Sequence, residues 1–90
     1  MSKSTTKTQA KTLNLRVVTP AETFYNGTAA SLSASNAKGQ FDVLPGHANF
    51  IALLTPGDLI FRAGQQEFKF PLQRGLIYVS NNDVLVLANF

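Results

Sequence analysis

The chain of 90 residues is long enough for one small domain, and a domain of this size buries only about 60–65% of the surface that its unfolded chain exposes. It has no cysteine, which excludes a disulfide framework, a thiolate nucleophile and a sulfur-ligated zinc site. The formal charge of +3 comes from Lys3, Lys7 and Lys11, because the other five of the eight lysines and arginines balance the five carboxylates. Residues 12–90 therefore carry no net charge and lack the clustered basic face that binding to phosphate backbones requires, so we expect no nucleic acid as a partner.

The first eleven residues contain Ser, Thr, Lys and Gln with a single Ala, and no apolar side chain beyond Met1 that could pack. This composition predicts a disordered basic tail over residues 1–11, followed by one domain over residues 12–90. No hydrophobic stretch of roughly 7–15 residues follows the basic start, as a secretory signal would require. No apolar run approaches the ~20 residues of a transmembrane helix, so we expect no direct membrane insertion.

From Thr12 onward, short runs rich in β-branched and aromatic residues alternate with turn formers, which predicts an all-β domain. Alternation is clearest from Leu13 to Val17, and it would turn one face of that strand inward and the other toward solvent. No segment shows convincing helical periodicity. The expected strands cover residues 13–18, 23–25, 28–35, 40–43, 50–53, 58–63, 67–72, 76–79 and 84–87.

Strands this short and numerous close best as a small β-sandwich or flattened barrel of about 9–10 strands. Asn26-Gly27, Gly64-Gln65 and Asn81-Asn82 suit tight hairpin turns, because Asn and Gly tolerate positive φ. Pro20 and Pro71 belong at strand ends or sheet edges, where a missing N–H is harmless. Six phenylalanines are expected as core or inter-sheet filler: Phe24, Phe41, Phe50, Phe61, Phe68 and Phe70.

The sequence holds no phosphate-binding, dinucleotide-binding, zinc-protease, nucleophile-elbow or EF-hand motif. Metal binding would depend on His47 and five scattered carboxylates without ligand spacing, so we expect neither a metal site nor a cofactor. His47 is the only histidine, and no nucleophile or paired carboxylate accompanies it in a recognisable arrangement. It is therefore interpreted as a turn or contact residue, and no catalytic residue is expected.

The segment Gly39-Gln40-Phe41-Asp42-Val43-Leu44-Pro45-Gly46-His47-Ala48 resembles a signature of the epsilon subunit of F-type ATP synthases, whose mitochondrial counterpart is named delta. Other blocks agree in order and spacing with the N-terminal β-sandwich of that family, from about residue 13 to 88. They are Leu15-Arg16-Val17-Val18-Thr19-Pro20, Phe24-Tyr25-Asn26-Gly27, Thr55-Pro56-Gly57-Asp58-Leu59-Ile60, and Gly75-Leu76-Ile77-Tyr78-Val79 with Val84-Leu85-Val86-Leu87-Ala88.

The resemblance implies a non-catalytic rotor part that couples rotation of the c-ring to the gamma subunit in proton- or sodium-driven ATP synthesis. It implies a peripheral position on the cytoplasmic face of a bacterial inner membrane, or on the equivalent organelle face. The loop of Lys38, Gly39, Gln40 and Phe41 would face the c-ring. The corner of His47, Ala48 and Asn49, together with Thr19, would face gamma.

The chain departs from the family pattern at several positions: Asn49 stands where Pro is common, and Gln40 where an acidic residue is frequent. The sequence ends at Phe90, where most family members continue into a pair of helices that senses nucleotide and inhibits ATP hydrolysis. Neither of those functions is expected here. Two other classes of function stay open: a barrel that binds single-stranded nucleic acid through exposed aromatics and the basic tail, and a hydrolase that uses His47.

Overall fold

A computed structural model describes residues 12–89, which form nine β-strands. The predicted tail, residues 1–11, lies outside the described residues, as does Phe90. Between residues 12 and 89 there is no helix long and apolar enough to cross a membrane. The strands are β2 (Leu13–Val18), β3 (Thr23–Ala29), β4 (Ser31–Asn36), β5 (Gly39–Val43), β6 (Phe50–Leu54), β7 (Gly57–Ala63), β8 (Gln66–Leu72), β9 (Arg74–Ser80) and β10 (Asp83–Asn89).

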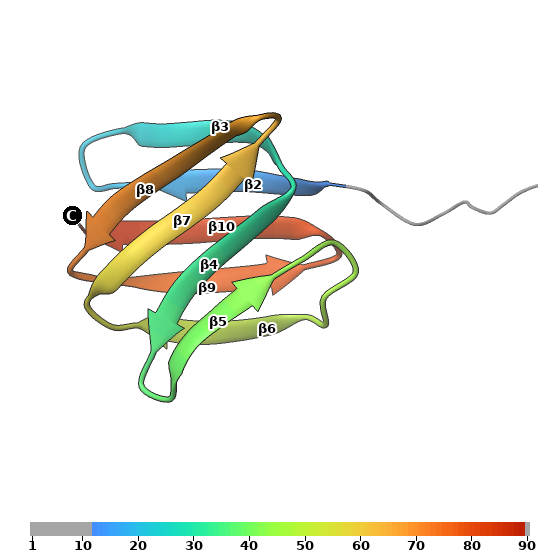
Figure 1. Cartoon of the computed structure of the whole chain (residues 1–90). Coiled ribbons are helices and arrows are strands. Elements are labelled where there is room, and N and C mark those ends of the chain that lie inside the picture. Colours follow the sequence, from blue (N-terminus) through green and yellow to red (C-terminus); the bar gives the residue numbers. More distant parts are fainter. Residues whose placement is uncertain (1–11, 90) are drawn as a thin grey trace, which may run out of the picture.

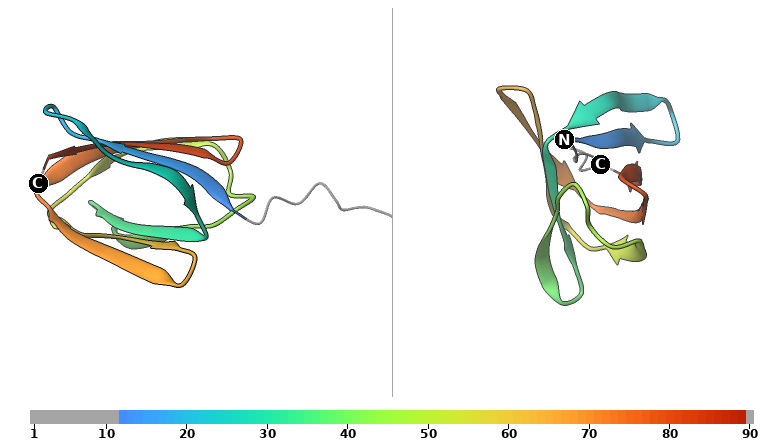
Figure 2. Two further views of the ribbon diagram at one scale, coloured as in Figure 1. Left: turned by 90° about the horizontal axis from the view of Figure 1, so that it is seen from above. Right: turned by 90° about the vertical axis from the view of Figure 1, so that its right-hand side faces the viewer.

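The strands form two sheets that pack face to face, which confirms the predicted β-sandwich (Figures 1 and 2). One sheet has the strand order β3-β2-β10-β9-β6 and the other has the order β5-β4-β7-β8. In Figure 1 the four-stranded sheet runs diagonally across the five-stranded one. The pairing of β2 with β10 is parallel, with Leu15 opposite Val84, whereas the other pairs are antiparallel. The sheet therefore joins the first described strand to the last.

The core lies between the sheets and is entirely apolar within the described part of the chain. Alternation places it there: Leu13, Leu15 and Val17 point inward and are buried, whereas Asn14 and Arg16 between them are exposed. Full burial of a side chain such as Leu or Phe contributes about 1.5–3 kcal/mol. The other buried side chains are Ala29, Leu32, Ala34, Val43, Leu54, Leu59, Phe61, Leu72, Ile77, Val79, Val84, Val86 and Ala88.

Aromatic rings close the sandwich along both of its open sides. On one side, Phe61 stacks on Phe68 of the four-stranded sheet with ring centroids 5.0 Å apart, and Tyr25 of β3 lies 4.7 Å from Phe61. On the other side, Phe41 of β5 meets Phe50 of β6 edge-on at 5.8 Å. Such pairs contribute about 0.5–1.5 kcal/mol beyond the burial of their area. The prediction of phenylalanines as core or inter-sheet filler is confirmed for these rings.

Phe24 fills the space between the sheets at their edge and does not lie in the core. Val17 lies opposite Tyr25 and Val18 opposite Thr23, so Phe24 is the extra residue of a β-bulge in β3. The bulge turns its side chain toward the edge, where 37% of the residue is exposed and its ring meets Phe70 edge-on at 4.6 Å.

The prediction of a hairpin turn at Asn26-Gly27 is wrong, because both residues lie inside β3. The ring of Tyr25 covers the space that a side chain at position 27 would fill: a Cβ there would lie 3.1 Å from its hydroxyl oxygen. That hydroxyl donates a hydrogen bond to the carbonyl of Thr28 at 2.7 Å. The close approach of the tyrosine therefore favours glycine at this position, and no turn is involved. The chain instead changes sheets at Ala30, whose N–H bonds to the carbonyl of Arg62 at 2.7 Å.

The other predicted tight turns are confirmed. Gly64 has a φ of 64° in the β7–β8 hairpin, and Asn81 and Asn82 have φ of 53° and 67° in the β9–β10 hairpin. Two consecutive positive φ values in a two-residue loop are the pattern of a type I′ turn, whose twist matches that of the flanking strands. Pro71 lies in β8, an edge strand, as predicted.

Candidate functional site

The connection between β5 and β6, residues 44–49, carries His47 and is called here the His47 loop. The His47 N–H bonds to the Leu44 carbonyl at 3.0 Å, and Gly46 has a φ of 86°. Pro at the second position of this turn and a positive-φ Gly at the third are the features of a type II turn. The sequence Leu44-Pro45-Gly46-His47 therefore produces a rigid corner whose residues are mostly exposed.

The surroundings of His47 are those of a contact residue. Its Nδ1 lies 2.9 Å from the Ala48 carbonyl oxygen, and its ring packs 4.9 Å from the ring of Phe50. Within residues 12–89, no hydrogen bond joins its ring to a carboxylate or a hydroxyl, and no cluster of three potential ligands that could hold a metal ion occurs. Among the described residues, the His47 ring thus has the Ala48 carbonyl as its hydrogen-bonding neighbour and Phe50 as its packing neighbour.

The four residues expected to face the c-ring lie in the β4–β5 hairpin, which projects from the lower end of the sandwich in Figure 1. Gly39 has a φ of 121°, which only glycine adopts readily, and the Lys38 N–H bonds to Asn36 Oδ1 at 2.8 Å. Lys38, Gly39 and Gln40 are exposed. Phe41 points inward against Phe50 instead, so it supports the hairpin and does not form part of its exposed tip.

Thr19 lies at the opposite end of the five-stranded sheet from His47. It follows the end of β2, beside the end of β10, whereas the His47 loop adjoins the β9–β10 turn at the other end of the same strands. Its hydroxyl is used locally: Oγ1 donates to the Glu22 carbonyl at 3.1 Å and accepts from the Glu22 N–H at 3.2 Å. The structure therefore does not bring together all four residues that were expected to face gamma.

Between these two ends lies a surface that sequence reasoning missed, the outer side of β6, β9 and β10. Its members form two cross-strand rows, Ile51–Tyr78–Leu85 and Leu53–Leu76–Leu87, and we call it the apolar face. The exposed fraction is 75% for Leu53 and 63% for Ile51. Monomeric soluble proteins rarely expose large contiguous apolar patches, and such patches usually mark surfaces that a partner covers.

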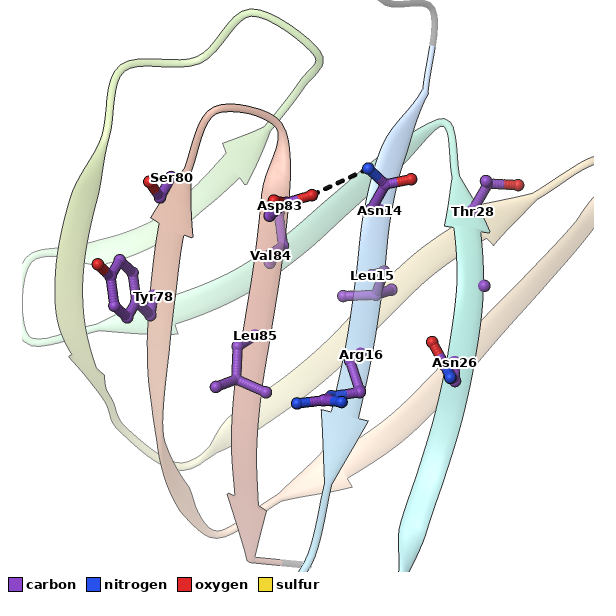
Figure 3. A pocket seen from close by; sticks show the side chains of 11 residues that line it. Asn14, Leu15, Arg16, Asn26, Thr28, Tyr78, Ser80, Asp83, Val84 and Leu85 are labelled. Atoms are coloured by element: carbon purple, nitrogen blue, oxygen red, sulfur yellow. Dashed lines mark hydrogen bonds between the residues drawn. The ribbon is translucent and has the colours of Figure 1, made fainter.

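Two shallow grooves extend the apolar face toward the two ends of the sheet. Figure 3 shows the groove at the His47 end, where Tyr78, Leu85, Arg16 and Asn26 lie side by side across four strands. The Arg16 side chain lies toward Leu85, and no ion pair joins it to another described residue. The second groove contains Thr19 together with Leu53, Leu76 and Leu87. One surface thus connects Thr19 with the neighbourhood of the His47 loop.

The described cations do not form the stripe that a nucleic-acid-binding barrel needs. Arg62 lies 3.5 Å from Glu67, and Lys69 lies 3.6 Å from Asp58, both pairs on the four-stranded sheet. Among residues 12–89, the large exposed aromatics are Phe24 and Tyr78, which lie on different strands of the other sheet. This arrangement provides no row of stacking platforms along a basic groove.

Comparison with known proteins identifies relatives over nearly the whole described body. The family model of the ATP synthase delta/epsilon chain β-sandwich domain matches residues 12–90. The ATP synthase epsilon chain of Clostridium novyi is 34% identical over 82 residues, covering 89% of this chain and 62% of that protein. The chloroplastic ATP synthase epsilon chain of Huperzia lucidula is 38% identical over 78 residues, covering 87% of this chain and 56% of that protein.

Solved structures show the same fold. A chain in the Euglena gracilis mitochondrial ATP synthase structure of OSCP, F1 and c-ring aligns with a TM-score of 0.83 and 18% identity, covering 93% of this chain and 54% of that one. A chain in the Tetrahymena thermophila mitochondrial ATP synthase central stalk and c-ring structure aligns with a TM-score of 0.75 and 15% identity, covering 92% of this chain and 67% of that one. The chain spans little more than half the length of the first relatives it matches. It belongs to the family of ATP synthase delta/epsilon chain β-sandwich domains.

Proposed function

We propose that this chain is a non-catalytic central-stalk subunit of a rotary F-type ATP synthase, which couples rotation of the c-ring to gamma during ion-driven ATP synthesis. Family membership supports this assignment, and the two structural neighbours come from ATP synthase structures that include a c-ring. The observation that carries it is the apolar face, because an exposed apolar sheet surface without a catalytic constellation fits a protein that works by contact.

In this proposal gamma covers the apolar face and extends to both ends of the five-stranded sheet. Thr19 would lie at one end of this interface, and His47, Ala48 and Asn49 at the other. At one end, a groove joins Thr19 to Leu53 of the apolar face. At the other end, the row of Ile51, Tyr78 and Leu85 begins next to Phe50, whose ring packs against that of His47. A single extended interface therefore accounts for site residues that lie far apart.

The β4–β5 hairpin would contact the c-ring through Lys38, Gly39 and Gln40. Phe41 fixes the hairpin against β6 through Phe50, which makes the tip a rigid projection. Because Gln40 is uncharged, the charge at this contact would come from Lys38. Such a contact places the protein at the membrane surface without insertion, on the cytoplasmic face of a bacterial inner membrane or its organelle equivalent.

Gel filtration of the chain mixed with its cognate gamma subunit tests the proposal. We expect a stable complex that elutes ahead of either protein, and a ternary complex when the c-ring is added in detergent. The charge reversal Lys38→Glu is expected to weaken only the c-ring step, because the hairpin belongs to the four-stranded sheet and the apolar face to the other one. Absence of any complex with gamma, together with salt-dependent binding to single-stranded DNA, would overturn the proposal in favour of a nucleic-acid-binding barrel.

A further inference from the structure

We propose that the β9–β10 turn is a positioning element for the His47 loop, acting through the side chains of Asn82 and Asn49. This inference rests on the proposed function, in which the His47 loop is part of the contact with gamma. It identifies residues that would affect recognition through the order of the loop.

Asn82 holds the tip of the loop. Its Oδ1 accepts a hydrogen bond from the Gly46 N–H at 2.8 Å, across 36 positions of sequence. Gly46 is the positive-φ residue of the type II turn, so this bond fixes the peptide that sets the direction of the corner preceding His47. The bond also satisfies an N–H that the turn itself leaves without a backbone partner.

Asn49 forms the reciprocal bond at the other end of the loop. Its Oδ1 accepts from the Asn81 N–H at 2.9 Å, across 32 positions of sequence. Each of the two turns therefore contributes one asparagine side chain and one backbone N–H, and the two bonds bracket His47 and Ala48. Asn49 Oδ1 is thus engaged within the molecule, which adds a positioning role to the place of Asn49 in the proposed contact with gamma.

The turn can serve as an anchor because it is itself fixed to the sheet. The Asn82 carbonyl accepts from the Asn14 N–H at 2.8 Å, and Asn14 Nδ2 donates to Asp83 Oδ1 at 2.9 Å. Asn81 and Asn82 adopt the left-handed conformation that a type I′ turn requires and that asparagine tolerates. Parallel pairing of β2 with β10 brings Asn14 to this point, so the loop is attached to the centre of the five-stranded sheet.

Without these two bonds the loop would be held mainly by its own turn bond and by the contact of His47 with Phe50. A loop that must be ordered on binding loses conformational entropy at that moment, which weakens association. A loop ordered beforehand avoids that loss. The asparagines are therefore expected to affect binding through the order of the free protein.

A matched set of variants separates this role from turn formation. Asn82→Gly keeps the positive φ and removes the acceptor for Gly46, whereas Asn81→Gly makes the same replacement at a neighbour whose side chain does not bond the loop. Asn82→Asp restores an acceptor at the same place. We expect N82G to bind gamma about threefold to tenfold more weakly, the factor that one hydrogen bond represents, with N81G close to wild type and N82D largely restored.

Amide hydrogen exchange of Gly46 in the free protein supplies a readout that does not depend on gamma. We expect its exchange to accelerate about threefold to tenfold in N82G but not in N81G. Equal behaviour of N82G and N81G in both measurements, or failure of N82D to restore them, would overturn the positioning role. If wild type itself does not bind gamma while the Gly46 exchange follows the expected pattern, the proposed function fails and the attachment of the loop stands.

Discussion

The two outer faces of this sandwich carry opposite surfaces. The outer side of the four-stranded sheet presents ion pairs, with Arg62 beside Glu67 and Lys69 beside Asp58. The outer side of the five-stranded sheet presents the apolar face, in which Leu53 is three-quarters exposed. Solvation on one side of an antiparallel sheet normally selects polar residues there, as on the four-stranded sheet.

The difference separates the part of the sequence that builds the core from the part that we propose serves contact. The inner faces of both sheets supply the buried core, so the fold does not need apolar side chains outside it. Apolar side chains that stay in water contribute little to the stability of the isolated domain, and they gain about 25 cal/mol per Å² only when another surface covers them. We therefore interpret the apolar face as the contact surface and the four-stranded outer face as the solvent surface.

The largest expected effect is on binding to gamma after a charge is placed on the apolar face. Leu53→Asp should weaken the complex by about 100-fold, because it buries an unpaired carboxylate in the interface and removes an apolar contact. Stability of the free domain should change little, since Leu53 is exposed. Isothermal titration calorimetry measures the affinity, and thermal unfolding measures the stability.

Lys69→Gln provides the matched control, because it changes the net charge by the same amount on the four-stranded sheet. It breaks only the exposed pair with Asp58 and should leave the affinity for gamma unchanged. Equal loss of affinity in the two variants would contradict the assignment of contact to one face.

A second comparison concerns the backbones of the two sheets. A Cβ at Gly75 would lie 2.6 Å from the Leu87 carbonyl oxygen, a backbone atom, whereas a Cβ at Gly57 would lie 3.0 Å from the Ser35 side-chain Oγ. We expect Gly75→Ala to lower the free energy of unfolding by about 1–3 kcal/mol, and Gly57→Ala by under about 1 kcal/mol because the serine can turn away. Urea unfolding of both variants checks the order, and a larger loss for G57A would contradict it.

The smallest effect is expected on the solvent surface itself. Arg62 and Glu67 are about half exposed, and their closest atoms are 3.5 Å apart. Replacing Glu67 with Gln should lower the free energy of unfolding by under about 0.5 kcal/mol and should not alter the affinity for gamma. Raising the salt concentration should reduce even this difference, whereas a clear loss of gamma binding would assign contact to the four-stranded face.

Most of the fold could be predicted from local patterns. Strict alternation from Leu13 to Val17 gave the bounds of β2, and Gly64-Gln65 and Asn81-Asn82 marked their turns through the need for positive φ. Asn26-Gly27 has the composition of a turn, yet the strand continues through both residues, which pair with Arg16 and Leu15 of β2. The Tyr25 ring lies over Gly27. The turn preferences of Asn and Gly contain no information about strand pairing or about a contact with the neighbouring tyrosine.

The candidate site was only partly predictable. The family resemblance singled out the loop at Lys38, and His47 was interpreted as a turn or contact residue, but the apolar face depends on register between strands far apart. A signal existed: the runs 76–79 and 84–87 are continuously apolar where a strand with one solvated face would alternate. The bonds from Asn82 to Gly46 and from Asn49 to Asn81 also follow from the tertiary fold alone.

Thiol labelling tests the central claim most directly, because the chain has no cysteine of its own. Single-cysteine variants Ile51→Cys and Lys69→Cys would be alkylated with iodoacetamide in the absence and presence of gamma. At gamma concentrations about tenfold above Kd, we expect alkylation of I51C to slow about tenfold while that of K69C is unchanged. Slower alkylation of K69C with no change at I51C would contradict the claim that the apolar face is the contact surface.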